Sequence, residues 1–251
     1  MTPSVSNAID VHHLEKRFGN FIAVDKISFS VRRGEIFGFL GANGSGKSTT
    51  IRMLCGILTP TSGFGEVAGF DILRQPEAIK QAIGYMSQKF SLYEDLTPYE
   101  NLRFYLGVYS VEKKRWASRI DWVLRMTGLQ EAQNRLTSEL PPGLRQRLAL
   151  GCALLHQPDI LFLDEPTSGV DPMTRRRFWN FIRLLAKDGM TIFVTTHYMD
   201  EAMFCERIVM INAGRIVASG TPADIIAGTC PGVTGADLGD AFVQLMTRNP
   251  V

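Results

Sequence analysis

Apolar and polar positions alternate in the first part of the chain as they do in β-strands. Two such runs, Ile9 to Phe18 and Phe21 to Val31, predict strands, and Gly19-Asn20 between them is typical of a hairpin turn. Three later runs have an apolar centre without alternating polar positions, which favours strands buried on both faces: residues 35–40, 160–163 and 191–196. Further strands are expected near residues 66–67, from 82 to 87, and in a closing hairpin at 207–211 and 216–219.

Segments of helical periodicity separate these strands. Lys47 to Cys55 predicts a helix that ends at Gly56, and Gly143 to His156 predicts another that ends before Pro158. A third begins at Asp171-Pro172 and ends at Gly189, with an apolar inner face made of Phe178, Phe181, Ile182 and Leu185. Buried strands that alternate with helices indicate an α/β fold.

The stretch from about Lys89 to Glu139 reads instead as a helical insert. Thr97-Pro-Tyr-Glu100 combines a capping threonine, a first-turn proline and a glutamate, so a helix begins there. A second helix is expected from Val111 to Met126, with Gly128 as its C-terminal cap and one apolar face formed by Trp116, Ile120, Val123 and Leu124.

Composition restricts the class of protein. The 251 residues are 45% hydrophobic and carry a formal net charge of +2, so no nucleic-acid partner is expected. The basic runs at 113–115 and 175–177 are short and fit solvated helix faces. Four cysteines at positions 55, 152, 205 and 230 lack metal-site spacing and indicate buried thiols in a reducing compartment. No apolar run is long enough to span a bilayer, so we expect a cytosolic chain unless a partner recruits it.

A glycine-rich loop between the strand at 35–40 and the helix after it carries the first chemical signal. It matches the P-loop pattern, in which consecutive backbone N–H groups form a nest for phosphate. Lys47 is expected to reach the β- and γ-phosphates, the Ser48 hydroxyl to bind Mg²⁺, and Thr49 to contact the α-phosphate. The nucleotide-binding residues predicted here are Gly41, Asn43, Gly44, Ser45, Gly46, Lys47, Ser48 and Thr49.

Polar residues at two strand ends carry the second signal. Asp164 and Glu165 follow a buried strand, at the edge where α/β sheets bind ligands. We expect Asp164 to hold the Mg²⁺ hydration shell and Glu165 to polarise the attacking water, rather than to cap the next turn. His197 directly follows another buried strand and is expected to contact the γ-phosphate and that water. Phe18 either stacks on the base of a bound nucleotide or packs in the core.

With these motifs in order, residues 7 to 228 resemble the ATP-binding subunit of ATP-binding cassette (ABC) transporters. The resemblance implies a P-loop NTPase core with an N-terminal antiparallel β subdomain (7–88 and 140–228), an inserted helical subdomain (about 89–139) and a short tail (229–251). It implies that Phe18 stacks on the base, that Gln88 joins Mg²⁺ and water to the membrane-domain interface, and that Asp171 belongs to a loop across a dimer axis. Glu165, His197 and Lys47 are then catalytic, and Ser48, Gln88 and Asp164 hold the metal.

The resemblance also implies ATP and Mg²⁺ as ligands, a second cassette, and separate membrane-spanning permease subunits at the cytoplasmic face of the membrane. Asp-Leu-Thr-Pro-Tyr-Glu-Asn at 95–101 and Thr-Ser-Gly-Val-Asp-Pro at 167–172 look most like the ABC-2 type export group. The direction of transport rests on that likeness alone.

Leu140-Pro-Pro-Gly-Leu144 departs from the family signature Leu-Ser-Gly-Gly-Gln, which grips the γ-phosphate of ATP held by the opposite subunit. Pro141 lacks the serine hydroxyl and Pro142 has no N–H, whereas the N–H of Gly143 and the helix dipole remain. Weaker capture of the partner's ATP is one expectation, and compensation by first-turn prolines or by Arg145 is another. Two arrangements are open. In a homodimer both ATP sites would contain the altered signature, whereas in a heterodimer a partner with an intact signature would complete one strong ATP site on this chain.

Two other classes fit parts of the pattern. A soluble ABC ATPase of translation, DNA repair or cluster assembly shares the motifs, although the translation members have two fused cassettes. A regulatory module that holds ATP without hydrolysis is suggested by the prolines, but Glu165 and His197 argue against it. A P-loop kinase gives no reason for Gln88, Asp171 and His197 together.

Overall fold

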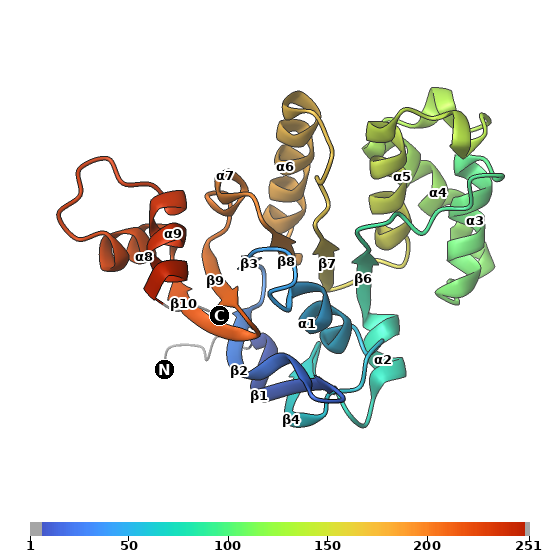
Figure 1. Cartoon of the computed structure of the whole chain (residues 1–251). Coiled ribbons are helices and arrows are strands. Elements are labelled where there is room, and N and C mark those ends of the chain that lie inside the picture. The colour runs from blue at the N-terminus through green and yellow to red at the C-terminus, as the bar shows by residue number, and fades with distance from the viewer. Residues whose placement is uncertain (1–6, 249–251) are drawn as a thin grey trace, which may run out of the picture.

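The structure is a computed structural model that describes residues 7–248, and it places two sheets one above the other (Figure 1). The smaller sheet is antiparallel, has the order β2-β1-β4-β5, and is built from β1 (Asn7–Phe18), β2 (Phe21–Arg32), β4 (Ser62–Val67) and β5 (Phe70–Asp71). Phe18 pairs with Phe21 across the expected Gly19-Asn20 turn.

The larger sheet has the order β10-β9-β3-β8-β7-β6. Its strands are β3 (Ile36–Leu40), β6 (Ile83–Met86), β7 (Ile160–Asp164), β8 (Thr191–Thr196), β9 (Arg207–Asn212) and β10 (Arg215–Gly220). All the pairings from β6 to β9 are parallel, and β10 closes the edge as the antiparallel half of the predicted hairpin. Because the central strands are parallel, the residues that follow β3, β6, β7 and β8 meet at one edge.

Aromatic side chains fill the space between the two sheets. Phe29 of β2 contacts Phe37, Phe39 and Phe193, with ring centroids 5.5–6.1 Å apart, and Phe162 lies 5.3 Å from Phe193. Helix α1 (Lys47–Leu54) adds Ile51, Met53 and Leu54 to this core. The P-loop, which connects β3 to α1, is thereby anchored at both ends to this core.

The other face of the large sheet is covered by helices. These are α5 (Pro142–Leu154), α6 (Pro172–Lys187), α7 (Met199–Ala202), α8 (Pro222–Thr229) and α9 (Leu238–Arg248). On α6 the inner face includes Phe178, Ile182 and Leu185 as expected, with Trp179 as an additional buried residue. The four cysteines are free and buried.

The helical insert forms a third core at one end of the molecule (Figure 1). It contains α3 (Pro98–Val108) and α4 (Trp116–Thr127), and the predicted capping box at Thr97 and Glu100 is present. Helix α5 serves two cores, since Leu148 and Cys152 face the insert while Leu150 and Leu154 face the sheet. Its C-terminal end is capped by Arg119, which donates to the carbonyls of Leu154 and Leu155, both at 2.8 Å.

Some boundaries differ from the prediction. The helix expected from Val111 begins at Trp116, after a 3₁₀ turn at Lys113–Arg115, because the Trp116 indole donates to the Val111 carbonyl and occupies it. The helix expected to reach His156 ends at Leu154. Four helices were not predicted: α2 (Pro76–Ala82), α7, α8 and α9.

Across residues 7–248, no helix combines the length and the apolar character that crossing a bilayer requires.

Candidate functional site

The glycines of the P-loop allow close backbone approach at the end of β3. A Cβ on Gly41 would lie 2.4 Å from the carbonyl oxygen of Ile211, and one on Gly46 would lie 2.6 Å from that of Ala23. Gly44 and Gly46 also have positive φ angles of 80° and 111°, which glycine adopts without strain. The loop therefore keeps its shape only with glycine at these positions.

Lys47, at the start of α1, is buried inside the loop that it follows. Its Nζ donates to the carbonyls of Gly41 at 2.8 Å and Ala42 at 3.0 Å, and it lies 3.1 Å from Oε1 of Glu165. The ammonium group thus balances the negative charge of the carboxylate that follows β7.

Ser48 and Asp164 present oxygen atoms side by side. The Ser48 hydroxyl donates to Oδ1 of Asp164 at 3.2 Å, and the Thr195 hydroxyl donates to the same atom at 2.7 Å. Burial raises the pKa of Asp164, and these two hydrogen bonds oppose that rise. Hydroxyl and carboxylate oxygens suit Mg²⁺, which keeps several waters and takes only one or two protein ligands. Among residues 7–248, no cluster of three or more His, Cys, Asp or Glu side chains is placed to hold a metal ion.

Glu165 is the meeting point of the predicted catalytic groups. Gln88 Nε2 donates to its Oε2 at 3.1 Å, and His197 Nδ1 lies 3.2 Å from the same oxygen. Its backbone has a φ of 47°, in the left-handed region, and its N–H donates to the carbonyl of Thr195 at 3.1 Å. A non-glycine residue held in this region is a strained position of the kind found at functional sites.

A cavity of about 340 Å³ opens beside these groups. The predicted residues that line it are Asn43, Gly44, Gly46, Lys47, Ser48, Thr49, Gln88 and Glu165, and Phe21 and Ala23 complete the wall. Gly41 and Ser45 are buried or close-packed behind the loop rather than in the cavity wall.

The aromatic residue on the wall is not the one predicted. Phe21 lines the cavity and is 63% exposed, whereas Phe18 is 51% exposed, lies outside the lining, and has Lys16 Nζ 5.3 Å from its ring. Phe18 and Phe21 pair across the Gly19-Asn20 turn, so the hairpin predicted from the sequence already places both rings near the cavity wall. Base stacking by Phe18 stays a prediction.

Gly143 and Asp171 lie apart from this cavity, in a second hollow of about 410 Å³ at the N-terminal ends of α5 and α6. Pro142 is the first residue of α5, where a missing N–H removes no intrahelical bond. Asp171 caps α6 by accepting from the N–H groups of Met173 and Thr174, both at 3.0 Å, and these bonds lower its pKa. The structure therefore separates the predicted site residues into two groups.

Arg145 does not extend toward this second hollow. Its Nη1 lies 3.3 Å from Oε1 of Glu94, in the helical insert. The compensation expected from Arg145 would require this ion pair to open.

Glu201 is a buried site residue that the sequence analysis missed. Its carboxylate is 1% exposed and accepts from the hydroxyls of Thr167, two residues after Glu165, and of Thr196 at 2.7 Å, directly before His197. Arg175 Nε of α6 lies 3.4 Å from it. Glu201 thus joins the segments after β7 and β8 to α6.

Comparisons with known proteins agree with this geometry. A family model described as "ABC transporter" matches residues 24–168. The probable multidrug ABC transporter ATP-binding protein YbhF of Escherichia coli (strain K12) is 49% identical over 242 residues, which cover 95% of this chain and 41% of that protein. The chain therefore spans about two fifths of the length of this relative.

Two solved structures have the same architecture. An ATP-binding subunit of an ABC transporter is 28% identical, with a TM-score of 0.84 over 95% of this chain and 99% of the other. A dimeric ATP-binding cassette in a post-hydrolysis state, bound to ADP and Pi, is 25% identical, with a TM-score of 0.77 over 85% of this chain and 98% of the other. The fold is that of an ABC ATPase nucleotide-binding domain, and the chain belongs to the ABC transporter family.

Proposed function

We propose that this chain is the nucleotide-binding subunit of an ABC exporter, which hydrolyses MgATP and drives separate membrane-spanning subunits. One observation carries the proposal. Lys47, Asp164, Glu165, Gln88 and His197, which come from four separate segments, meet in or directly beside the P-loop cavity. A chain that only held nucleotide would have no use for a carboxylate and a histidine at the γ-phosphate end of that loop.

The residues divide the chemistry among them. The P-loop N–H groups bind and orient the phosphates. Lys47 leaves its ion pair with Glu165 and binds the β- and γ-phosphate oxygens instead. A magnesium ion held by Ser48, Asp164 and Gln88 would neutralise negative charge on the phosphates. Once Lys47 has moved, Glu165 is free to accept the proton of the attacking water, and His197 orients that water and the γ-phosphate.

We further propose that two cassettes close around each ATP. Gly143 and Asp171 are too separate from the P-loop cavity to serve this chain's own nucleotide, so they face the nucleotide of a partner. The dimeric relative with ADP and Pi supports this arrangement. Because Pro141 and Pro142 remove two donors from that face, a partner with an intact signature would complete a stronger site than a second copy would.

Coupling to membrane subunits at the cytoplasmic face is the last element of the proposal. Gln88 contacts Glu165 and stands where the chain leaves β6 for the helical insert. A change at the γ-phosphate can therefore move the insert relative to the core. The name of YbhF, a probable multidrug ABC transporter ATP-binding protein, supports a role for this chain in driving a transporter.

The test is the Glu165→Gln variant of the purified chain. We expect phosphate release to fall by about a hundredfold or more, since a general base contributes about 10²–10⁴ in rate. ATP binding remains and ATP-bound dimers accumulate, measured by size-exclusion chromatography. Glu66→Gln on the exposed surface of β4 is the control and keeps normal turnover. Normal turnover in Glu165→Gln would refute the assigned role, and co-purification with no membrane protein would favour a soluble ABC ATPase.

A further inference from the structure

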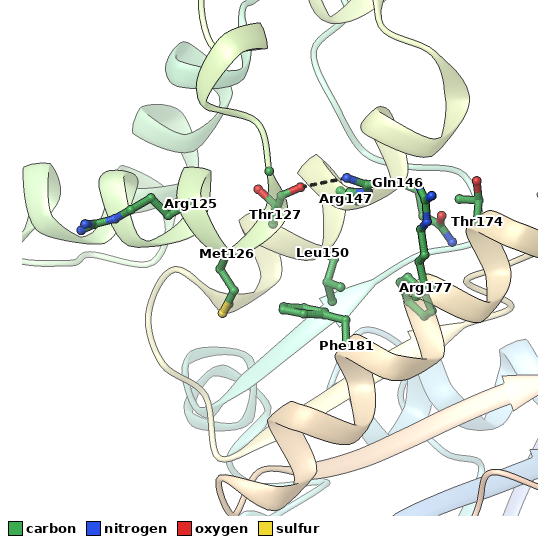
Figure 2. Close-up of a pocket in the computed structure, with 11 residues that line it drawn as sticks. Arg125, Met126, Thr127, Gln146, Arg147, Leu150, Thr174, Arg177 and Phe181 are labelled. Atoms are coloured by element: carbon green, nitrogen blue, oxygen red, sulfur yellow. Dashed lines mark hydrogen bonds between the residues drawn. The ribbon is translucent and has the colours of Figure 1, made fainter.

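A third pocket, partly open to solvent, lies between α4, α5 and α6, where the helical insert meets the core (Figure 2). Its volume is about 360 Å³, which falls in the usual range for small-molecule sites. It shares no lining residue with the nucleotide cavity. It does share Arg147 and Thr174 with the second hollow at the N-terminal ends of α5 and α6, although the proposed ATPase reaction assigns neither residue a role.

One side of this space is apolar. Figure 2 shows the side chains of Met126, Leu150 and Phe181 pointing toward one another from three different helices. Met126 and Phe181 are partly buried, and Leu150 is buried. An apolar group placed here would lose contact with water on several sides, which is favourable in proportion to the area covered.

The opposite side is cationic and lacks a balancing acid. Arg147, which is half-buried, and Arg177, which is exposed, line it, and no aspartate or glutamate is among the lining residues. Within residues 7–248 neither guanidinium has a carboxylate within ion-pair distance, and Arg147 Nη1 donates only weakly to the carbonyl of Thr127 at 3.4 Å. Arg125 differs, because its side chain points away in Figure 2 and pairs with Asp121.

A buried acceptor lies beside the arginines. Gln146 is fully buried and its Nε2 donates to the carbonyl of Pro166 at 2.6 Å. That bond fixes the orientation of the amide, and the Oε1 atom has no hydrogen-bond partner within the described chain. Buried polar atoms are nearly always satisfied, so a group that completes this environment is expected.

We propose that this cavity binds a small amphipathic anion, an organic carboxylate or phosphate monoester with an apolar body. The acidic head lies between Arg147 and Arg177, where charge-assisted hydrogen bonds are strong, and the body covers Met126, Leu150 and Phe181. A hydroxyl group of the ligand, or a water molecule bound to its acidic head, donates a hydrogen bond to Oε1 of Gln146. Because its walls come from both the insert and the core, an occupant ties these two parts together.

The test uses three probes that share one alkyl body and differ in the head: octanoate, octanol and octylammonium. Binding to the full chain is measured by isothermal titration calorimetry and ligand-observed NMR, with ADP in excess to fill the nucleotide site. We expect saturable binding of octanoate and binding of the other two at least about tenfold weaker. Arg177→Gln weakens octanoate binding by about ten- to a hundredfold. Arg176→Gln, on the exposed neighbour that does not line the cavity, leaves it unchanged.

Three results would overturn the proposal. Equal binding of octylammonium would show that charge does not select the ligand. Unchanged octanoate affinity in Arg177→Gln would place the probe elsewhere. Binding only to phosphatidylglycerol vesicles, dependent on Arg177 and without any binding of free octanoate, would assign the arginines to a membrane surface. None of these measurements depends on ATP hydrolysis, so the result is independent of the proposed function.

Discussion

The buried carboxylate of Glu201 offers the sharpest test of how the site is held in shape. Glu201→Ala removes the acceptor of two threonine hydroxyls and leaves Arg175, whose side chain is 20% exposed, without its buried partner. Breaking a buried pair of this kind costs about 3–5 kcal/mol. Glu201→Gln keeps the volume and one carbonyl acceptor, so its cost is nearer to one charge-assisted hydrogen bond, about 1.5–3 kcal/mol.

Thermal unfolding without nucleotide measures these costs. One kcal/mol corresponds to a shift in Tm of about 2–4 °C for a chain of this size, so alanine lowers Tm by roughly 6–20 °C and glutamine by about half of that. Asp200→Asn is the matched control, because Asp200 also approaches Arg175, at 3.4 Å, but is 70% exposed, and its cost stays within about 0.5 kcal/mol.

The same variants report on catalysis. Thr196 directly precedes His197, and Thr167 follows Glu165, so loosening Glu201 displaces groups at the γ-phosphate and leaves the P-loop intact. Under the proposed function, kcat falls while the KM for ATP changes little in Glu201→Gln. An alanine variant with the Tm of the wild type would refute the assignment of Glu201 as a positioning residue.

Three further outcomes are expected. Arg119→Met leaves two carbonyls at the end of α5 without donors and lowers stability by about 2–4 kcal/mol in urea unfolding, whereas exposed Arg125→Met changes it by less than about 1 kcal/mol. Burial raises the pKa of Asp164, so the folded state binds the carboxyl proton more tightly than the unfolded state does, and stability is lost as pH rises through that raised pKa. Asp164→Asn removes this loss and therefore raises the Tm of the nucleotide-free chain at neutral pH, while it abolishes stabilisation by Mg²⁺ with ADP. Burial lowers the pKa of His156 to about 4, so the stability present above the ordinary histidine pKa is lost as pH falls toward 4. His156→Phe retains the stacking on Tyr109 and is expected to flatten this part of a plot of Tm against pH. An unchanged slope would contradict this account.

Motifs that depend on local geometry were predictable from the sequence. The P-loop glycines, the Asp164-Glu165 pair and His197 each follow a buried strand, and parallel pairing of β3, β7 and β8 necessarily brings strand ends to one edge. The Glu201 network was not predictable in this way, because its partners come from three segments and a glutamate in a short helix has no distinctive pattern. Helix α9 was missed for a related reason, since its inner face consists of only Leu238, Ala241 and Leu245.

The left-handed backbone of Glu165 has a consequence for engineering this chain. A side chain at φ 47° costs about 1 kcal/mol or more, and glycine would remove that cost while deleting the carboxylate. Glycine would also leave the buried Lys47 ammonium without its carboxylate, which costs about 3–5 kcal/mol and outweighs the relief of the backbone. A library screened for heat resistance alone would therefore retain Glu165 in the nucleotide-free chain, because stability and turnover select the same residue at this position.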